Sequence, residues 1–426
     1  MMAEPDFDPS SYVPKDDLSL WWLGNSGHPI RVGQISLVRA NRSVSLRYDH
    51  TWLRSGFALS EDVPLTGQTF IPAEKDTAAG AVNDARPDRW GERVIRFLYK
   101  PARLSLLEYL LFAGDERFGA LSVSANPAHY QPKATGPLPV LDDVPALHRL
   151  VQQVIAGEPV AAEHRRLLSP GATLGGARPK ALLQIDGSAW MVKFTEPGDL
   201  VDTPLMEHAT MKLAAQAGIR VAQTRLLPLT SRAGQGTTHA IAVKRFDRVQ
   251  GSRVHAISAD VALRAAGEHI SYPALSQVLR RRGIAHGHTR QQHMHELFRR
   301  MVFNILVDNT DDHEKNHALL MTDSQEYALA PAFDVLPALQ SLGYQQMQVG
   351  AAMADATLDN ALSQASLFGL SCQLACDLVR EVVKVADRWR EHFREAGMTQ
   401  RDLDRVADHL ERPFLAQQRN DWRQAD

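Results

Sequence analysis

Cysteine is scarce in this sequence, and its two cysteines lie only four residues apart, at Cys372 and Cys376. Two cysteines cannot build a framework of several disulfides, and such scarcity is typical of proteins kept in a reducing compartment. Residues four apart share one face of a helix. Because the surrounding stretch is apolar and has helical spacing, we expect both thiols to pack in the core.

Long apolar runs are missing as well. No stretch approaches the roughly 20 apolar residues that cross a membrane. The opening MMAEPDFDPS lacks the basic and then apolar pattern of a signal peptide. We therefore expect a cytoplasmic protein with no membrane partner.

The sequence also has no dominant charge, since 47 Lys and Arg face 49 Asp and Glu, for a net charge of -2. Proteins that bind nucleic acid by neutralising phosphates are usually more basic, at least in a patch. Arginine is locally dense at residues 280–282 and 299–300. We expect both runs to be solvated helix faces, and we predict no direct DNA binding.

What is present is an ordinary globular composition, with 44% hydrophobic and 23% charged residues over a length that suits two or three domains. Strand-like text dominates the first half and helical spacing the second, which predicts an α+β protein with two lobes. The predicted divisions are a loose segment at 1–17, a subdomain at 18–135, a β-rich lobe at 136–250 and a helical lobe at 251–426.

A glycine-rich loop at 171–180 (GATLGGARPK) precedes two apolar runs that are separated by Asp186 and Gly187. Asp-Gly between such runs predicts a β-hairpin, whose return strand carries Lys193. The next helix carries Glu207, which could pair with Lys193 or favour the helix N-terminus through the dipole. A further strand is expected at 239–248.

The densest polar cluster is VDNTDDHEKNH at 307–317, between an apolar helix and an apolar strand. His313 to His317 match H-E-x-x-H, which on a helix holds zinc for hydrolysis. That motif needs a continuous helix, whereas residues 309–312 favour a turn and the residues after His317 are strand-like. A zinc hydrolase is therefore the weaker alternative.

The same cluster also suits phosphoryl transfer, which needs a base, oxygen ligands for Mg²⁺ and a cation on the phosphates. Asp311 can be the base, and Asn316 follows at the base-to-metal-ligand spacing of kinase catalytic loops. Asp334, expected at a strand end, offers a second oxygen ligand. Lys193 offers the cation, and the glycines of the 171–180 loop let backbone approach phosphates.

Taken in order, these motifs resemble those of the HipA family, the kinase toxins of bacterial type II toxin–antitoxin pairs. They are TLGGARPK (173–180), Lys193 in MVKF, the helix with Glu207, VKRFDR (243–248), DDHEKN (311–316) and PAFD (331–334). GQISLVRANRSVSLRYDHTWL and DERFGALSV also resemble the N-terminal subdomain of that family. The resemblance therefore covers nearly the whole chain past about residue 30 and implies a two-lobed, protein-kinase-like fold.

The resemblance implies that Asp311 is the catalytic base and that Asn316 and Asp334 hold Mg²⁺. It implies ATP contacts from Gly175, Gly176, Ala177, Arg178, Pro179, Lys180, Lys193, Lys244, Arg245, Phe246, His313, Glu314, Lys315, Asn316, Phe333 and Asp334. The sequence departs from the best-known member of the family at Lys244, which replaces a Glu. Loss of that carboxylate would alter the ribose or adenine contact, whereas a backbone contact would survive. Thr173 stands where the family has its autophosphorylated residue, with nearby Ser169 as the alternative.

By the same resemblance the cofactors are ATP and Mg²⁺, and the target is a protein Ser or Thr hydroxyl. An aminoacyl-tRNA synthetase is the implied substrate, with growth arrest and persistence as the consequence. A small helix-turn-helix antitoxin of HipB type would neutralise the toxin and supply the contact with DNA. The alternative is a kinase-like co-repressor that acts with such a partner, which the retention of every catalytic group disfavours.

Overall fold

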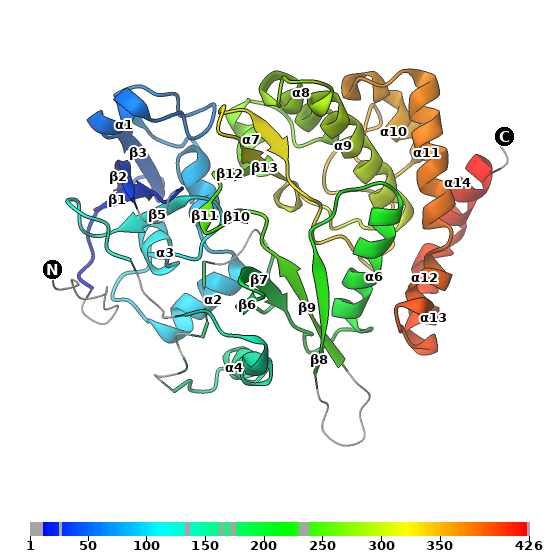
Figure 1. Ribbon diagram of the computed structural model, residues 1–426, viewed down its shortest axis with the longest axis horizontal. Coiled ribbons are helices and arrows are strands. Elements are labelled where there is room, and N and C mark those ends of the chain that lie inside the picture. The colour runs from blue at the N-terminus through cyan, green and yellow to red at the C-terminus, as the bar shows by residue number, and fades with distance from the viewer. Residues whose placement is uncertain are drawn as a thin grey trace. The chain divides into compact units, whose positions relative to one another are not determined.

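The structure is a computed structural model that describes residues 12–24, 28–132, 137–161, 164, 167–168, 170–171, 176–229 and 238–423. The chain forms two compact units (Figure 1), one of Met1–Val192 with Arg245–Ala266 and the other of Lys193–Lys244 with Gly267–Asp426. The chain passes between the units at three places, and the linear domain boundaries suggested by the sequence stay a prediction. No helix in the described ranges combines the length and the apolar character that crossing a membrane requires.

The first unit contains a five-stranded sheet in the order β4-β3-β2-β1-β5. Its strands are β1 (Asp17–Trp22), β2 (Ile30–Val38), β3 (Ser43–Tyr48), β4 (Thr69–Phe70) and β5 (Leu121–Ser124), and all neighbours are antiparallel. The turn between β2 and β3 contains Arg42 in the left-handed region, with φ 55°. Leu20, Ile35 and Leu46, which lie on β1, β2 and β3, are fully buried.

The rest of this unit consists of short helices and strand pairs. They are α1 (His50–Ser55), η2 (Gly80–Ala85), α2 (Arg89–Leu98), α3 (Leu106–Phe112), η3 (Leu141–Asp143), α4 (Val144–Ala156), β6 (Lys180–Ile185), β7 (Ser188–Lys193), β10 (Arg248–Val249), β11 (Ser252–Arg253), β12 (Ala256–Ser258) and α7 (Ala259–Ala265). Asp186 and Gly187 join β6 to β7 with φ of 49° and 73°. Positive φ at both central residues is what a type I′ hairpin turn requires, so the hairpin predicted from Asp186 and Gly187 is confirmed.

The second unit begins with α6 (Thr203–Gln216), followed by β8 (Thr224–Leu229) and β9 (Thr238–Lys244), which pair antiparallel. Figure 1 shows α6 lying alongside this long strand pair. Asp202 caps the start of the helix, because its side chain accepts a hydrogen bond from the Leu205 amide at 3.2 Å, and Gly218 follows the helix end with φ 78°. The strand expected at 239–248 stops at Lys244, because the next residues enter a buried ionic cluster of the first unit.

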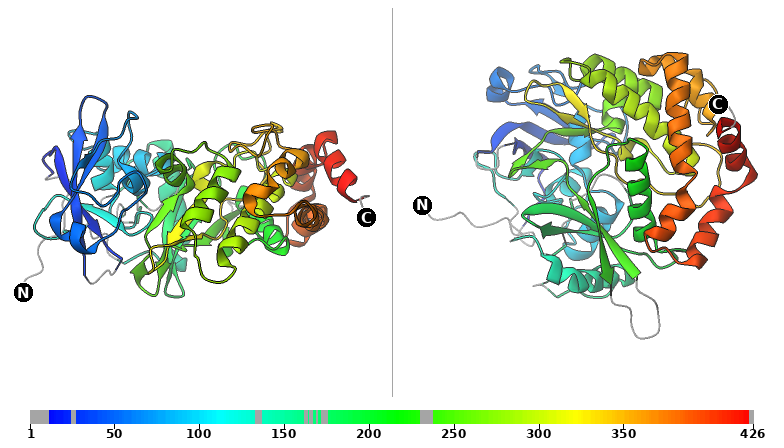
Figure 2. Two further views of the ribbon diagram at one scale, coloured as in Figure 1. Left: turned by 90° about the horizontal axis from the view of Figure 1, so that it is seen from above. Right: turned by 45° about the vertical axis from the view of Figure 1, so that its right-hand side comes forward.

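Helices make up most of the remainder, and α11 to α14 run from orange to red in Figure 2. The elements are α8 (Tyr272–Arg282), α9 (Thr289–Leu306), η4 (Glu314–Asn316), β13 (Ala318–Met321), β14 (Tyr327–Leu329), α10 (Leu358–Ser363), η5 (Ala365–Phe368), α11 (Cys372–Ala386), α12 (Trp389–Glu395), α13 (Gln400–Leu410) and α14 (Pro413–Arg423). Strands β13 and β14 form an antiparallel hairpin. Leu297, Phe298 and Met301 of α9 are fully buried, so α9 is the central helix of this core.

Two expectations about burial are wrong. Cys372 is exposed and Cys376 is half-buried, because the buried face of α11 is formed by Ala375, Val379 and Val382 instead. Arg300 is buried, with 3% exposure, whereas the run at 280–282 is exposed as expected. The guanidinium of Arg300 lies inside because backbone carbonyls and Glu296 satisfy its donors there.

Buried histidines predict that the fold weakens in acid. Burial lowers the pKa of His208, His255 and His293 to about 4, below the usual 6.5. A group whose pKa is lower in the folded state favours unfolding as pH falls, because the unfolded chain binds more protons. We expect fully buried His255 alone to lower the free energy of unfolding by about 2 kcal/mol between pH 6.5 and 5.

Urea unfolding at pH 7, 6 and 5 measures this loss. The Nε2 of His255 lies 3.0 Å from the carbonyl oxygen of Leu59, so His255→Gln keeps a donor but does not titrate. The variant should lose less stability across this interval than the wild type. An equal slope for both proteins would contradict the role of His255.

Candidate active site

Lys193 is the centre of a buried charge cluster in the second unit. Its ammonium lies 2.8 Å from Glu207 Oε1 and 2.5 Å from Asp334 Oδ1. Burial by itself lowers the pKa of Lys193, but the charges of Asp334 and Glu207 outweigh it, and the pKa is raised. Lys193 therefore stays protonated, and its pairing decides between the two roles that the sequence allows for Glu207. Glu207 is an ion-pair partner in the second turn of α6, past the first-turn positions that favour a helix dipole.

Asp334 lies in an irregular segment five residues after β14 ends at Leu329, so the expected strand end is wrong. Its backbone is left-handed, with φ 58°. The segment before it is held by neighbours: Arg300 donates to the carbonyl of Ala330 at 2.7 Å, and Ala332 exchanges backbone hydrogen bonds with residues 220 and 222. These contacts bring the Asp334 carboxylate, one quarter exposed, to Lys193.

The polar cluster at 307–317 forms a turn after α9. Asp308 is buried in a left-handed conformation and accepts two hydrogen bonds from Arg412, at 2.8 and 3.0 Å. Asp311 is exposed, as a base that meets a protein substrate must be. Asn316 is buried, and its Nδ2 donates to the Asp311 carbonyl at 3.5 Å. Its Oδ1 has no hydrogen-bond partner among the residues that the structure describes.

The unpaired Oδ1 of Asn316 bears on the predicted magnesium site. A buried amide oxygen without a donor is costly, and such oxygens are ligands that Mg²⁺ accepts. The described residues hold no group of three or more His, Cys, Asp or Glu arranged for a metal. Mg²⁺ at kinase-type sites takes one or two protein oxygens and completes its shell with phosphates and water. Asn316 and Asp334 therefore suit a nucleotide-bound ion.

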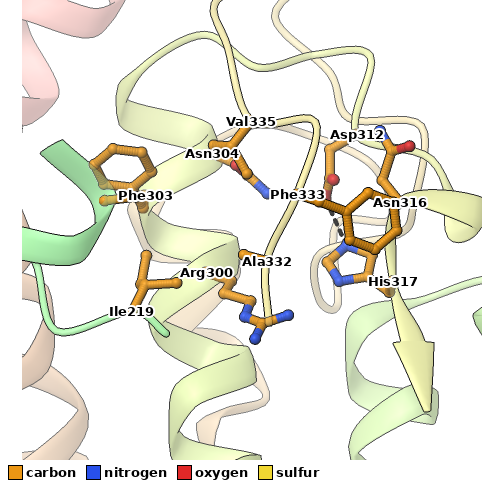
Figure 3. A pocket seen from close by; sticks show the side chains of 11 residues that line it. Ile219, Arg300, Phe303, Asn304, Asp312, Asn316, His317, Ala332, Phe333 and Val335 are labelled. Carbon is orange, nitrogen blue, oxygen red and sulfur yellow. Dashed lines mark hydrogen bonds and ion pairs between the residues drawn. The ribbon is translucent and has the colours of Figure 1, made fainter. Parts of the chain in front are cut away.

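A small cavity borders this loop, and Figure 3 shows its lining. Arg300, Asn304, Asp312, Asn316 and His317 contribute its polar walls, and its apolar walls include Phe303 and Phe333. Its volume is about 10 Å³, room for one water molecule. A space of this size cannot hold a nucleotide.

Three buried residues at the 307–317 loop were not predicted from the sequence: Tyr272, Asp312 and His317. His317 Nε2 donates to Asp312 Oδ2 at 2.8 Å, and the hydroxyl of Tyr272 donates to the same oxygen. All three side chains are buried. Asp312 stands beside the predicted base and could have been noticed, whereas nothing in the sequence links it to Tyr272, 40 residues away.

The H-E-x-x-H pattern does not form the helix that zinc binding by this motif requires. Glu314–Asn316 is a single 3-10 turn, flanked by His313 and His317 in extended conformations. The Nε2 of His317 already donates a hydrogen bond to Asp312. This geometry removes the structural basis of the zinc-hydrolase alternative. His313, Glu314 and Lys315 are half-buried on the turn itself.

The phosphate loop lies partly outside the described residues, which include neither Thr173 nor Gly175. Gly176 has φ 98°, a conformation that favours glycine. Lys180 is buried, and its ammonium pairs with Asp88 at 2.7 Å within the first unit. Lys180 thus has an internal partner in addition to its predicted phosphate contact. Ala177, Arg178 and Pro179 lie between Gly176 and β6.

The predicted adenine segment divides at the boundary between the units. Lys244 ends β9, and its amide donates to the Gln223 carbonyl at 2.8 Å. Arg245 is buried in the first unit, where it pairs with Asp247 at 2.6 Å. The ring of Phe246 meets Phe118 edge to face at 6.2 Å. The side chain of Arg245 is thus held by an ion pair and that of Phe246 by a ring contact. This leaves the backbone of the segment for the predicted contact with adenine.

Two known domain families match this chain. The HipA N-terminal domain matches residues 27–124, and the HipA-like C-terminal domain matches residues 172–391. This chain belongs to the HipA family. The resemblance to this family that the ordered motifs indicated is confirmed.

Two relatives of this HipA-family chain add to the assignment. A Sinorhizobium fredii protein named "Putative kinase Y4dM" is 28% identical over 242 residues, which are 52% of this chain and 57% of that protein. HipA of Shewanella oneidensis MR-1, solved with HipB and its operator DNA, has a TM-score of 0.64 at 18% identity. That match covers 95% of this chain and 97% of the other, which confirms the predicted α+β, kinase-like fold.

Proposed function

We propose that this chain is an ATP- and Mg²⁺-dependent serine/threonine protein kinase that acts as a HipA-like toxin. The observation that carries the proposal is the buried Lys193, which joins Glu207 of α6 to Asp334. A lysine paired with a helix glutamate, next to an aspartate that can hold metal, is the arrangement that protein kinases need for transfer. The name of the Sinorhizobium fredii relative, "Putative kinase Y4dM", agrees with it.

In this proposal each group has one task. Asp311 accepts the proton of the attacking Ser or Thr hydroxyl, whose oxygen bonds to the γ-phosphorus as the bond from phosphorus to the β–γ bridging oxygen breaks. Asn316 and Asp334 would hold Mg²⁺, which neutralises phosphate charge when bound. Lys193 stabilises the charge that develops on the phosphates. Residues 175–180 and 244–246 would contact the nucleotide, as would Phe333 and residues 313–315.

The partners are proposed on the same basis. The structural relative was solved with HipB and operator DNA, which supports a small antitoxin of HipB type as the partner of this chain. DNA would then be reached through the antitoxin, because this chain carries a net charge of only -2. The proposed target is a translation-related protein such as an aminoacyl-tRNA synthetase. Neutralisation by the antitoxin would relieve growth arrest.

The experiment that tests this function is a transfer assay on the purified chain. With γ-labelled ATP and Mg²⁺ we expect label on Ser or Thr of a protein acceptor, and none when EDTA removes the metal. Mass spectrometry of the 169–180 peptide in the same reaction reports whether Thr173 or Ser169 is autophosphorylated. Transfer to tyrosine alone, or no nucleotide binding at all, would contradict the proposal.

A further inference from the structure

The two residues proposed for catalysis have a common feature in the chain. Asp311, the base, is followed directly by Asp312, and Asn316, the metal ligand, is followed directly by His317. Asp312 and His317 are hydrogen-bonded to each other at 2.8 Å and are each 2% exposed. The buried pair therefore closes the same loop whose outer residues would act on substrate and metal.

The pair is tied in turn to two helices. Tyr272, the first residue of α8, donates its hydroxyl to Asp312 and is fully buried. Near the end of α9, Asn304 donates to the Tyr272 oxygen at 3.3 Å and accepts from Asn309 at 3.1 Å. This chain of hydrogen bonds runs from the helices to the inner side of the loop.

Asp312 has the charge that such an anchor needs. Burial by itself raises the pKa of Asp312, but His317 and the donated hydrogen bonds outweigh it, so that the pKa is lowered. An ionised buried carboxylate requires its donors, since an unmatched buried charge is costly. The donors from α8 and from the far end of the loop are thus held firmly in place.

We propose that Tyr272, Asp312 and His317 are positioning residues that set the separation and orientation of Asp311 and Asn316. The inference rests on the proposed function. In-line transfer needs the base and the metal ligand in register, and a displacement of about 1 Å in a reacting group can cost roughly 10²-fold in rate. Loosening the brace formed by these three residues shifts both groups, although none of its members touches substrate.

A merely structural role would give a different result, which a matched pair of variants can detect. Tyr48 in the first unit is also buried, and its hydroxyl donates to the Val63 carbonyl at 2.7 Å and accepts from the Leu59 amide at 3.1 Å. Tyr272→Phe and Tyr48→Phe therefore each remove one buried phenol hydroxyl, and each hydroxyl donates one hydrogen bond and accepts another within the described residues. Thermal unfolding, kcat, KM for ATP and the Mg²⁺ concentration at half-maximal rate are measured for both.

We expect both variants to unfold a few degrees earlier than wild type. Only Tyr272→Phe should lower kcat, by about tenfold or more. Only this variant should also need more Mg²⁺ for half-maximal rate. It should likewise need more Mg²⁺ before a non-hydrolysable ATP analogue stabilises it against heat. Wild-type kcat and Mg²⁺ dependence in Tyr272→Phe would overturn the inference, as would equal losses in Tyr48→Phe. A wild-type chain without Mg²⁺-dependent transfer would instead refute the proposed function.

A second pair of variants keeps the test decisive if Tyr272→Phe does not fold. His317→Gln retains a side-chain amide that can donate to Asp312, whereas His317→Ala retains none. We expect His317→Gln to recover a large part of the kcat lost in His317→Ala and to restore the Mg²⁺ requirement towards wild type. Equal kcat and Mg²⁺ requirement in the two folded variants would overturn the brace.

Discussion

Asp311→Asn should reduce phosphoryl transfer by about 10²–10⁴-fold, the usual loss when a general base is removed. Asparagine keeps the size of the side chain and most of its hydrogen bonding, but it cannot take the hydroxyl proton. Asp311 is exposed on the turn after α9, so the asparagine stays in contact with solvent and adds no bulk to the core. Folding and ATP binding should therefore persist. Initial rates with labelled ATP, together with calorimetry of ATP binding, measure the two properties separately.

The matched control is Asp323→Asn, an exposed aspartate between β13 and β14 in the same unit. It changes the same charge without touching the loop, and its transfer rate should equal that of the wild type. Full activity in a well-folded Asp311→Asn protein would show that another group is the base. Unchanged growth arrest by the inactive variant would favour the co-repressor alternative.

Lys193→Met should remove ATP-dependent activity and weaken the fold at the same time. The Lys193 side chain is 5% exposed, and its ammonium faces two carboxylates, of which the Glu207 side chain is 3% exposed. Removing one member of a buried ion pair typically costs about 3–5 kcal/mol, because the remaining charge is left unmatched. Loss of the cation on the phosphates should also weaken ATP binding. Urea unfolding and calorimetry measure the two effects.

A double-mutant cycle separates these two effects. Glu207→Gln added to Lys193→Met removes one stranded carboxylate, so the double variant should regain part of the lost stability but no activity. Arg103→Met is the matched control in the first unit, where Arg103 pairs at 2.7 Å with the buried Glu108. It should be destabilised in a similar way while ATP affinity stays at the wild-type value. Additive stabilities in the cycle would contradict direct pairing of Lys193 with Glu207.

Local physics explains which features could be predicted from the sequence. The turn at Asp186 and Gly187 depends on two adjacent residues that tolerate positive φ, so the hairpin that delivers Lys193 was predictable. The break of helix after α9 depends on a short polar run with turn-forming residues, and it separated the catalytic-loop interpretation from the zinc motif. The order of the motifs then identified the family, which the domain matches confirm.

The tertiary structure alone decided which distant groups meet. Asp334 reaches Lys193 from 141 residues away, and Tyr272 reaches Asp312 from 40 residues away. Neither separation has a period or a local geometry that a sequence can display, because helix packing and loop closure set them. The burial of Arg300 also depends on a contact with a distant residue, although the sequence places Arg300 in a charged run. It lies inside because the carbonyl of Ala330, 30 residues further along the chain, accepts its hydrogen bond.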